Sequence, residues 1–213
     1  AQTAQDAARL AKLGANVQGV LGNFKFDVQP DSAQLVQGRA WHQGHTKPVI
    51  IFASSRDGEE AMLLEKLKQN RALALVKPAQ TAIDLIANHV QWLIVPRHPQ
   101  RFDDVAALVQ QHGFSVSRRS SWGQGAAPGV ADVWLGDSMG EMALYYGLGH
   151  VALLGGSFAP LGGQNLIEAA ACGCPVVTGP SVFNFQEAAT LAQQAGAAFP
   201  VLSMVEGVQL AVA

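Results

Sequence analysis

Continuous apolar segments recur along this chain, separated by stretches with the pattern of amphipathic helices. The longest are PVIIFAS (48–54), WLIVP (92–96) and HVALLGG (150–156), and shorter ones lie at 114–117, 132–136, 175–179 and 197–201. A strand with one face in water alternates apolar and polar residues, whereas a continuous apolar run is typical of a strand covered on both faces. Such strands, joined by helices, form a parallel sheet between two helical layers. The sequence therefore predicts an α/β fold with a doubly wound, Rossmann-like parallel sheet.

The helices between these strands are expected from their caps and charges. Thr3 and Asp6 resemble a capping box at the start of the first helix. Glu59 and Glu60 lie in the first turn of the helix after the strand 48–54, where the helix dipole favours acidic side chains. Further helices are expected at about 31–43, 80–89, 102–112, 140–147, 165–172 and 185–195.

Composition excludes several classes of function. Of the 213 residues 49% are hydrophobic, and 14 basic against 16 acidic side chains leave a formal charge of -2. The apolar content is too high for a disordered chain, and without a basic excess no nucleic-acid partner is expected. The segment 142–163 has no Asp, Glu, Lys or Arg, but its glycines and Pro160 interrupt it too often for a membrane-spanning helix. We therefore expect it to form buried core.

Cysteines and histidines give no sign of a metal site. Cys172 and Cys174 are one residue apart, a spacing that fits neither a disulfide framework nor a zinc half-site and is compatible with a reducing compartment. His42 and His45 lie three residues apart on a predicted helix, but no acidic or cysteine partner lies nearby in the sequence. We predict no metal, and Cys174 is expected to be a small buried residue at the start of a strand.

Polar residues follow four of the predicted strands. In a doubly wound sheet, ligands bind beyond the carboxyl ends of the strands, at the point where the strand order reverses. Ser54 and Ser55 follow the first long strand, and Arg97 and His98 follow the second, inside Pro-Arg-His-Pro. The segment 137–141 follows the strand 132–136, and a glycine-rich segment follows the strand 150–156. All four should meet at one edge of the sheet.

The glycine-rich segment is the most informative of the four. Glycines allow a close approach of the backbone to a ligand, and a helix starting near Asn165 would point its free N–H groups at an anion such as a phosphate. Glu168 would then be placed to accept hydrogen bonds from a ribose. An equally simple interpretation needs no ligand, because Asn165 and Glu168 also fit a capping box.

The other three segments also allow two interpretations. Arg97 between two prolines suits a phosphate or carboxylate, yet it also fits an ordinary surface arginine. Ser54 and Ser55 could hold a sugar or phosphate, or simply cap the next helix. Ser138 with Glu141 fits another capping box, and Met139 could pack on a flat base.

Taken together and in order, these segments resemble a known family. The motifs are GNFKFD (22–27), ASSRDGEE (53–60), IVPRHPQRF (94–102), LGDSMGEMALYY (135–146) and GGSFAPLGGQNLIEAAACGCPVVTGPSVFNFQE (155–187). They resemble the C-terminal half of the 3-deoxy-D-manno-octulosonic acid (Kdo) transferases, glycosyltransferases of lipopolysaccharide biosynthesis that add Kdo to lipid A precursors. The resemblance extends from about Gln2 to Val201.

The resemblance implies an organisation that the residues alone do not. Family members have a GT-B fold, in which the C-terminal domain holds the donor CMP-Kdo. The N-terminal domain carries a membrane-associating segment, the acceptor surface and a glutamate base. We therefore expect residues 1–30 to be the terminal helix and linker of a preceding domain, and residues 31–213 to be the donor-binding domain, truncated at its C-terminus.

Several expectations follow from that organisation. The chain should contain no catalytic residue and need no cofactor, and it should be inactive by itself. Its partners should be CMP-Kdo, its own N-terminal domain and, through that domain, the lipid A precursor. The complete enzyme should act at the cytoplasmic face of the bacterial inner membrane, while the present chain should be soluble.

The family's donor-binding residues are carried over by matching motifs. Arg97 would contact the phosphate or the sugar carboxylate, and Glu168 would lie near the ribose. Ser54 and Ser55 stand where the family more often has Ser-Thr, and Gln164 stands where it commonly has His. The phosphate-side loop would comprise Gly156, Ser157, Gly162, Gly163 and Asn165, and the cytidine side Ser138, Met139, Gly140 and Glu141. The segment 118–129 matches nothing in the family and is expected to be a mobile loop.

Two other functions remain open from the sequence. The chain could be the donor domain of another GT-B enzyme, such as a UDP-sugar transferase or a nucleotide-sugar epimerase, or it could be a non-catalytic nucleotide-binding module. A dinucleotide oxidoreductase is less favoured, because VQGVLGNFKFD (17–27) lacks the G-x-G-x-x-G pattern.

Overall fold

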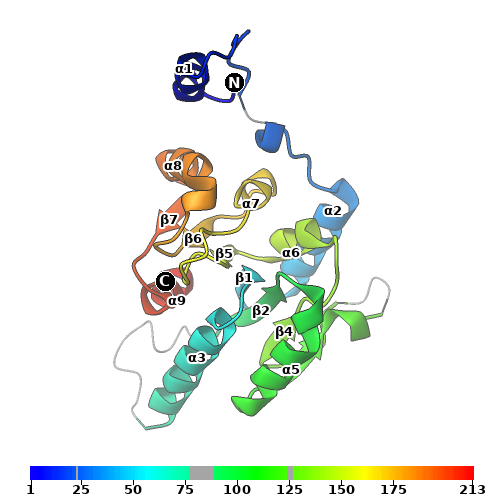
Figure 1. Ribbon diagram of the computed structural model, residues 1–213. Helices are drawn as coiled ribbons and strands as arrows, with labels where there is room; N and C mark the ends of the chain where they lie inside the picture. The colour runs from blue at the N-terminus through cyan, green and yellow to red at the C-terminus, as the bar shows by residue number, and fades with distance from the viewer. Residues whose placement is uncertain (23, 77–88, 124–126) are drawn as a thin grey trace.

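The protein is built around a parallel seven-stranded sheet. The computed structural model describes residues 1–22, 24–76, 89–123 and 127–213 (Figure 1). The strands are β1 (Val49–Ser55), β2 (Gln91–Pro96), β3 (Val116–Arg118), β4 (Val133–Leu135), β5 (Val151–Leu154), β6 (Val176–Thr178) and β7 (Ala198–Pro200). Their order is β3-β4-β2-β1-β5-β6-β7, and each neighbouring pair is parallel. The predicted Rossmann-like sheet is confirmed.

The strand order reverses between β1 and β5. From β1 the chain builds one half of the sheet through β2, β3 and β4, and then crosses back to add β5, β6 and β7 on the other side of β1. At such a reversal the connections after the two central strands leave in opposite directions, which opens a crevice at their carboxyl ends. The topology thus directs attention to the residues that follow β1 and β5.

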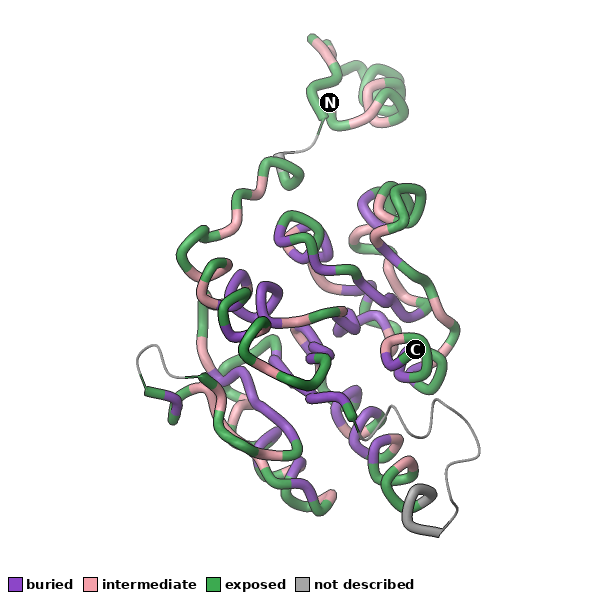
Figure 2. Tube along the Cα trace, turned by 180° about the vertical axis from the view of Figure 1, so that it is seen from behind, coloured by how far each residue is buried: buried purple, intermediate pink, exposed green. Residues whose placement is uncertain are grey.

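Helices cover both faces of the sheet, as the continuous apolar runs predict. Ile51 and Ala53 of β1 face one core, together with α2 (Ser32–Gly44), α6 (Met142–Leu148), α7 (Ile167–Ala171) and α8 (Gln186–Gln194). Ile50 and Phe52 face the other core, together with α3 (Glu59–Val76), α5 (Phe102–Gln111) and α9 (Met204–Val212). The two-residue period of a strand divides these neighbours between the two faces. In Figure 2 the buried residues, in purple, lie mainly along the strands and along the helices beside them.

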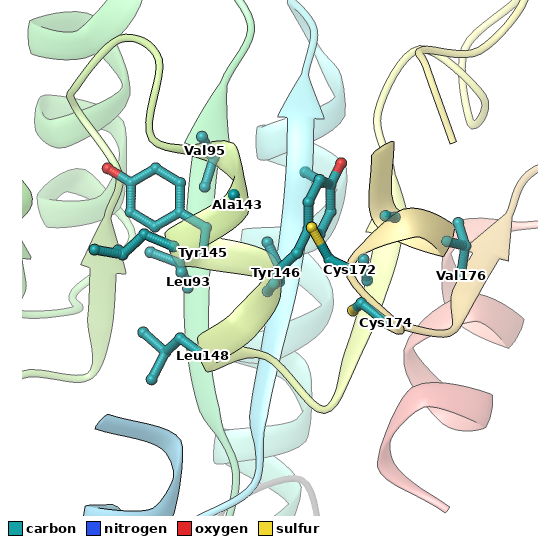
Figure 3. Close-up of a cluster of buried hydrophobic side chains, with 14 of the residues drawn as sticks. Leu93, Val95, Ala143, Tyr145, Tyr146, Leu148, Cys172, Cys174 and Val176 are labelled. Carbon is teal, nitrogen blue, oxygen red and sulfur yellow. The ribbon is translucent and has the colours of Figure 1, made fainter. Parts of the chain in front are cut away.

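The first core contains both cysteines. Cys172 and Cys174 lie beside Tyr146 and Val176 in a closely packed cluster (Figure 3). Burial raises the pKa of the Cys172 thiol to about 11 and that of the Cys174 thiol to about 12. Thiols that stay protonated at neutral pH are weak nucleophiles. Both cysteines therefore serve as small core residues, as expected for Cys174.

Four predictions about local structure need correction or fall outside the described residues. The helix expected at 80–89 lies almost entirely outside the described part of the chain. Helix α9 was not predicted, although Ser203 caps it by accepting a hydrogen bond from the backbone N–H of Glu206. Helix α6 begins at Met142 and α7 at Ile167, both later than expected. The segment 118–123, expected to be part of a mobile loop, begins in β3 and continues into a 3-10 turn whose Trp122 is buried.

The N-terminal segment differs from the rest of the molecule. Helix α1 (Ala4–Lys12) has no buried residue, and Figure 1 shows it beside the N-terminus, away from the sheet. Thr3 caps α1 through Asp6, as predicted. In residues 1–22, 24–76, 89–123 and 127–213, no helix has the length and apolarity needed to cross a membrane. The proposed boundary near residue 30 stays a prediction.

Candidate functional site

The four polar segments meet at the carboxyl edge of the sheet. The backbone N–H of Arg97 donates to the carbonyl of Ser55 at 3.0 Å, and that of Gly155 donates to Ala53 at 2.8 Å. The N–H of Gly136 donates to Ile94 at 2.8 Å, which adds the end of β4. Four cavities of about 270–420 Å³ lie elsewhere, and none of them is lined by a predicted donor-binding residue. The candidate site is therefore an open edge rather than an enclosed pocket.

Ser54 has an unusual backbone conformation at the centre of this edge. Its φ of 54° is in the left-handed region, and the pairing register of β1 with β2 shifts between Ala53 and Ser55. Across the crevice, a Cβ on Gly155 would lie only 2.2 Å from the carbonyl oxygen of Ser54, so glycine is required there. A non-glycine residue held at positive φ is typical of functional sites. Ser54 thus remains a candidate ligand-binding residue.

Ser55 is placed differently from the prediction. Its side chain is fully buried, and its hydroxyl donates to Glu60 Oε1 at 2.7 Å. Glu60 is also fully buried and pairs with Arg101 through two bonds, at 2.8 Å and 3.0 Å. The hydroxyl of Ser55 therefore connects the end of β1 to α3 inside the protein and is not exposed to a bound ligand.

Ser157 needs the same correction. It is fully buried, donates to the carbonyl of Leu154 and accepts from the N–H of Gly179 at 2.8 Å. These two bonds tie the end of β5 to the end of β6. The Ser157 side chain is structural, and only its backbone belongs to the loop.

Glu59 binds the loop after β5 from inside. Its Oε2 accepts hydrogen bonds from the backbone N–H groups of Arg56 at 2.9 Å and Gly156 at 2.7 Å. Its Oε1 accepts from Phe158 at 3.0 Å and Ala159 at 3.2 Å. The sequence indicates for Glu59 only a place in a helix first turn, because its three loop partners lie 97–100 residues away along the chain. The N–H of Gly156 is therefore already bonded and is not available to a phosphate.

The following segment leaves a different set of amides available. The N–H of Gly162 donates to Ser181 Oγ at 2.9 Å and that of Gly163 to the carbonyl of Gly156 at 2.8 Å. In the described part of the chain, the N–H groups of residues 164–166 donate to no protein acceptor. Unsatisfied backbone N–H groups in consecutive positions can bind an anion.

The predicted capping box at Asn165 is wrong. Asn165 Oδ1 accepts from the N–H of Ile167 at 3.1 Å, but the residue that precedes α7 is Leu166. Helix α7 has five residues, too few for a large dipole. Any anion binding here would depend on the loop amides rather than on the helix.

Arg97 reaches from the end of β2 towards this loop. Its side chain is exposed, and its Nε donates to Gln164 Oε1 at 3.2 Å. Burial raises the pKa of the half-buried Glu168, and the nearby charge of Arg97 partly opposes that rise. A carboxyl group with a perturbed pKa beside an exposed cation at an open edge is a common feature of functional sites. Arg97, Gln164 and Glu168 therefore form one cluster.

The segment after β4 forms a second cluster. Ser138 Oγ donates to Glu141 Oε2 and also bonds the hydroxyl of Tyr145. Glu141 pairs with Arg119 at 2.8 Å. Because α6 starts at Met142, Ser138 is not its cap, which corrects the predicted capping box. Met139 is 60% exposed, so its side chain is available to a ligand.

The residues that hold this second cluster are not among the predicted site residues. The Arg119 guanidinium lies 5.8 Å from the ring centroid of Trp41 and 5.6 Å from that of Trp122. Asp137 accepts from Arg118 Nε at 2.7 Å and from the N–H of Ser120 at 2.8 Å. Burial by itself would raise the pKa of Asp137, but these hydrogen bonds lower it overall. No local pattern in 118–123 indicates these contacts.

His42 and His150 lie at the opposite end of the sheet. His42 stacks on His150 with ring centroids 3.8 Å apart, and His150 Nδ1 accepts from the N–H of Val49. No group of three or more His, Cys, Asp or Glu side chains within the described ranges is placed to hold a metal.

Known proteins provide an independent comparison. A search of protein-family models gives no match. The chain is 50% identical over 198 residues to a 3-deoxy-D-manno-octulosonic acid transferase of Bordetella pertussis, which covers 93% of this chain and 44% of that protein. It is 36% identical to the Haemophilus influenzae protein of the same name, over 79% of this chain and 36% of that protein. The chain thus spans less than half the length of these relatives.

A solved structure matches nearly its whole length. The C-terminal CMP-Kdo binding domain of WaaA from Acinetobacter baumannii superposes with a TM-score of 0.67 at 30% identity, covering 85% of this chain and 90% of that domain. The chain belongs to the 3-deoxy-D-manno-octulosonic acid transferase family, in which it corresponds to the C-terminal domain.

Proposed function

We propose that this chain is the donor-binding domain of a glycosyltransferase that moves Kdo from CMP-Kdo to a lipid A precursor. The observation that carries the proposal is the convergence of Arg97, the unbonded amides of residues 164–166 and Glu168 at the switch point of the sheet. Relatives named as Kdo transferases, and a matching domain named for CMP-Kdo binding, support the choice of donor.

The roles of the residues follow from their chemistry. Arg97 and the amides of residues 164–166 would hold the donor phosphate, and Glu168 would accept hydrogen bonds from the ribose. Ser138, Met139, Gly140 and Glu141 would line the cytidine, with Ser54 close to the sugar or phosphate. Gly162 and Gly163, which have no side chains, would allow the loop backbone to lie close to the donor phosphate. The side chains of Ser55 and Ser157 would not contact the donor and would only fix the strand ends through their hydrogen bonds.

The chemical task of this domain would be charge stabilisation. Transfer breaks the bond between the anomeric carbon of Kdo and the phosphate oxygen, so negative charge grows on CMP as it leaves. Preorganised cations and N–H groups lower the energy of that transition state. A base in the N-terminal domain would take the proton of the acceptor hydroxyl, and closure of the two domains would align the reactants.

The same proposal extends to the complete protein. Its acceptor surface and base would lie in the preceding domain, to which residues 1–30 would connect, and it would act at the cytoplasmic face of the inner membrane. The present chain alone would bind the donor without transferring it.

The proposal is tested by titrating the chain with CMP and with UMP while amide shifts are recorded by NMR. We expect CMP-selective changes at Arg97, 138–141 and 162–168. Equal or stronger changes with UMP would instead favour a UDP-sugar enzyme of the same fold. If neither nucleotide causes changes at millimolar concentration, the chain is not a donor-binding domain by itself.

A further inference from the structure

Glu59 occupies an amide cradle where a bound anion could otherwise sit. Its fully buried carboxylate accepts four backbone hydrogen bonds, three of them from Gly156, Phe158 and Ala159 in the loop after β5. Burying a carboxylate is unfavourable unless it is fully hydrogen-bonded, and here each oxygen accepts two N–H groups. The carboxylate of Glu59 thus accepts loop N–H groups that could otherwise bind an anionic ligand.

The contact continues from Glu59 to the candidate site through one residue, Gly156. The N–H of Gly156 is held by Glu59, and the carbonyl of Gly156 accepts the N–H of Gly163 at 2.8 Å. Gly163 directly precedes Gln164, whose side chain accepts from Arg97. The position of residues 163–166 therefore depends on a residue whose N–H Glu59 binds.

Glu60 performs a related task for the neighbouring strands. It joins Ser55 at the end of β1 to Arg101, which follows β2. Two consecutive carboxylates of α3 thus hold the ends of three adjacent strands, but only Glu59 contacts the loop that leads to residues 164–166.

We propose that Glu59 is a positioning residue for the donor phosphate. Its carboxylate accepts the N–H groups of Gly156, Phe158 and Ala159, and the N–H groups of residues 164–166 are left to contact the phosphate. The loop thereby has two sets of N–H groups: one set binds the Glu59 carboxylate, and the other binds the donor phosphate. This inference rests on the proposed function, because it assigns which amides meet the donor.

The wild-type chain allows a direct test with CMP as the probe. NMR measures the exchange of individual amides with water in the presence and absence of saturating CMP. We expect CMP to slow exchange and shift the signals at residues 164–166, and to leave the amides of Gly156, Phe158 and Ala159 unchanged. Direct CMP contact at Gly156, Phe158 and Ala159 would overturn the inference.

Variants test the positioning role itself. In Glu59→Gln one of the two carboxylate oxygens becomes an NH₂ group. This group is a donor, and it would face backbone N–H groups that are donors as well. We expect the Kd for CMP to rise about tenfold, because a site loses affinity when its support is removed. Glu59→Asp keeps the charge and should recover part of the affinity. Glu206→Gln is a matched control, since Glu206 also accepts a backbone N–H, from Leu202 at 2.9 Å, but lies outside the loop.

A loss of overall stability must be distinguished from a loss of positioning. Val109→Ala truncates a fully buried side chain of α5, far from the loop, and provides a variant of reduced thermal stability. If Val109→Ala loses as much CMP affinity as Glu59→Gln at a comparable Tm, the positioning role is wrong. Should Glu59→Gln fail to fold, the exchange pattern of the wild-type chain decides. Unchanged affinity in Glu59→Gln would overturn this inference alone, whereas no CMP binding by the wild-type chain would overturn the proposed function with it.

Discussion

The two ends of the sheet treat polar side chains in opposite ways. Among the described residues, the buried carboxylates are Glu59, Glu60 and Asp137, and all three lie at the carboxyl end. At the amino end, the buried polar side chain is the neutral Gln91, and His42 and His150 stack on each other. Among the described residues, buried acidic side chains are thus confined to one end of the sheet.

This difference supports the proposed ligand site at the carboxyl end. A buried carboxylate is rarely a gain in stability over a well-packed apolar side chain, so its presence calls for another explanation. At the carboxyl end each of the three carboxylates holds a loop that leads to an exposed polar residue. At the amino end, the carboxylate of Asp132 accepts hydrogen bonds from the N–H and the hydroxyl of Ser115, but Asp132 is exposed. The comparison therefore agrees with the rule that parallel sheets bind ligands at their carboxyl ends.

Removal of Arg101 should have the largest effect on stability. Arg101→Met leaves the fully buried Glu60 without its cation, which should lower the free energy of unfolding by about 3 kcal/mol. Urea denaturation of wild type and variant measures the difference. Asp57→Asn is the control, because Asp57 contacts the same arginine but is 95% exposed on its side chain and should matter little. Equal stability of Arg101→Met and wild type would contradict the picture of a carboxyl end held by buried charge.

Arg97 should affect function and leave stability unchanged. In the full-length enzyme, Arg97→Ala should lower turnover about tenfold or more, and weaken CMP binding less, if the guanidinium stabilises charge on the departing phosphate. Rate measurements and CMP titration separate the two quantities, and His98→Ala in the same loop is the control. Equal losses in turnover and affinity would make Arg97 only a binding residue.

The same variant has a second consequence at Glu168. Burial raises the pKa of Glu168, and the charge of Arg97 partly opposes this rise. Arg97→Ala should therefore raise the pKa of Glu168 further, which a carboxyl carbon titration by NMR detects. An unchanged pKa would mean that the two side chains do not interact in solution.

The amino end should respond to pH with a smaller effect. Partial burial lowers the pKa of His45 and of His150, and neighbouring cationic groups lower both further. The unfolded chain then takes up protons first, so stability should fall as the pH drops below about 6.5. Urea midpoints between pH 7.5 and 5.5 measure this slope. His150→Gln should make it shallower, while His98→Ala, in an exposed loop, should not change it.

Much of the fold could be predicted because it depends on local patterns. The strands β1, β2, β4, β5 and β6 are apolar runs whose two faces meet two cores, so the centre of the sheet follows from hydrophobicity. The edge strand β3 (Val-Ser-Arg) is not such a run. Helix α9 had the same kind of signal, since Ser203 and Glu206 form a capping pattern, but it was not recognised.

The site could be predicted only in outline. The sequence identified which strand ends meet, since all strands are parallel. It did not show that Ser55 and Ser157 point inward, because their partners Glu60 and Gly179 are chosen by tertiary packing. For the same reason the sequence predicts helix caps at Ser138 and Asn165: both lie before a helix, but the real starts depend on contacts such as that between Ser138 and Tyr145.

Met139 provides the finest test of the comparison between the two ends. Its exposed side chain at the carboxyl end is proposed to pack on the cytosine ring, so Met139→Ala should weaken CMP binding by about threefold. Val130 is the matched control, because it is an exposed apolar side chain near the amino end of β4, and Val130→Ala should leave CMP affinity unchanged. Surface truncations of this kind change stability by about 0.5 kcal/mol or less, so a difference between the two Kd values reports on contact with the ligand. If both variants bind CMP like the wild type, the cytosine does not lie on Met139, and the base-binding surface must then be sought at Ser138 and Glu141, whose mutual hydrogen bond faces the same edge.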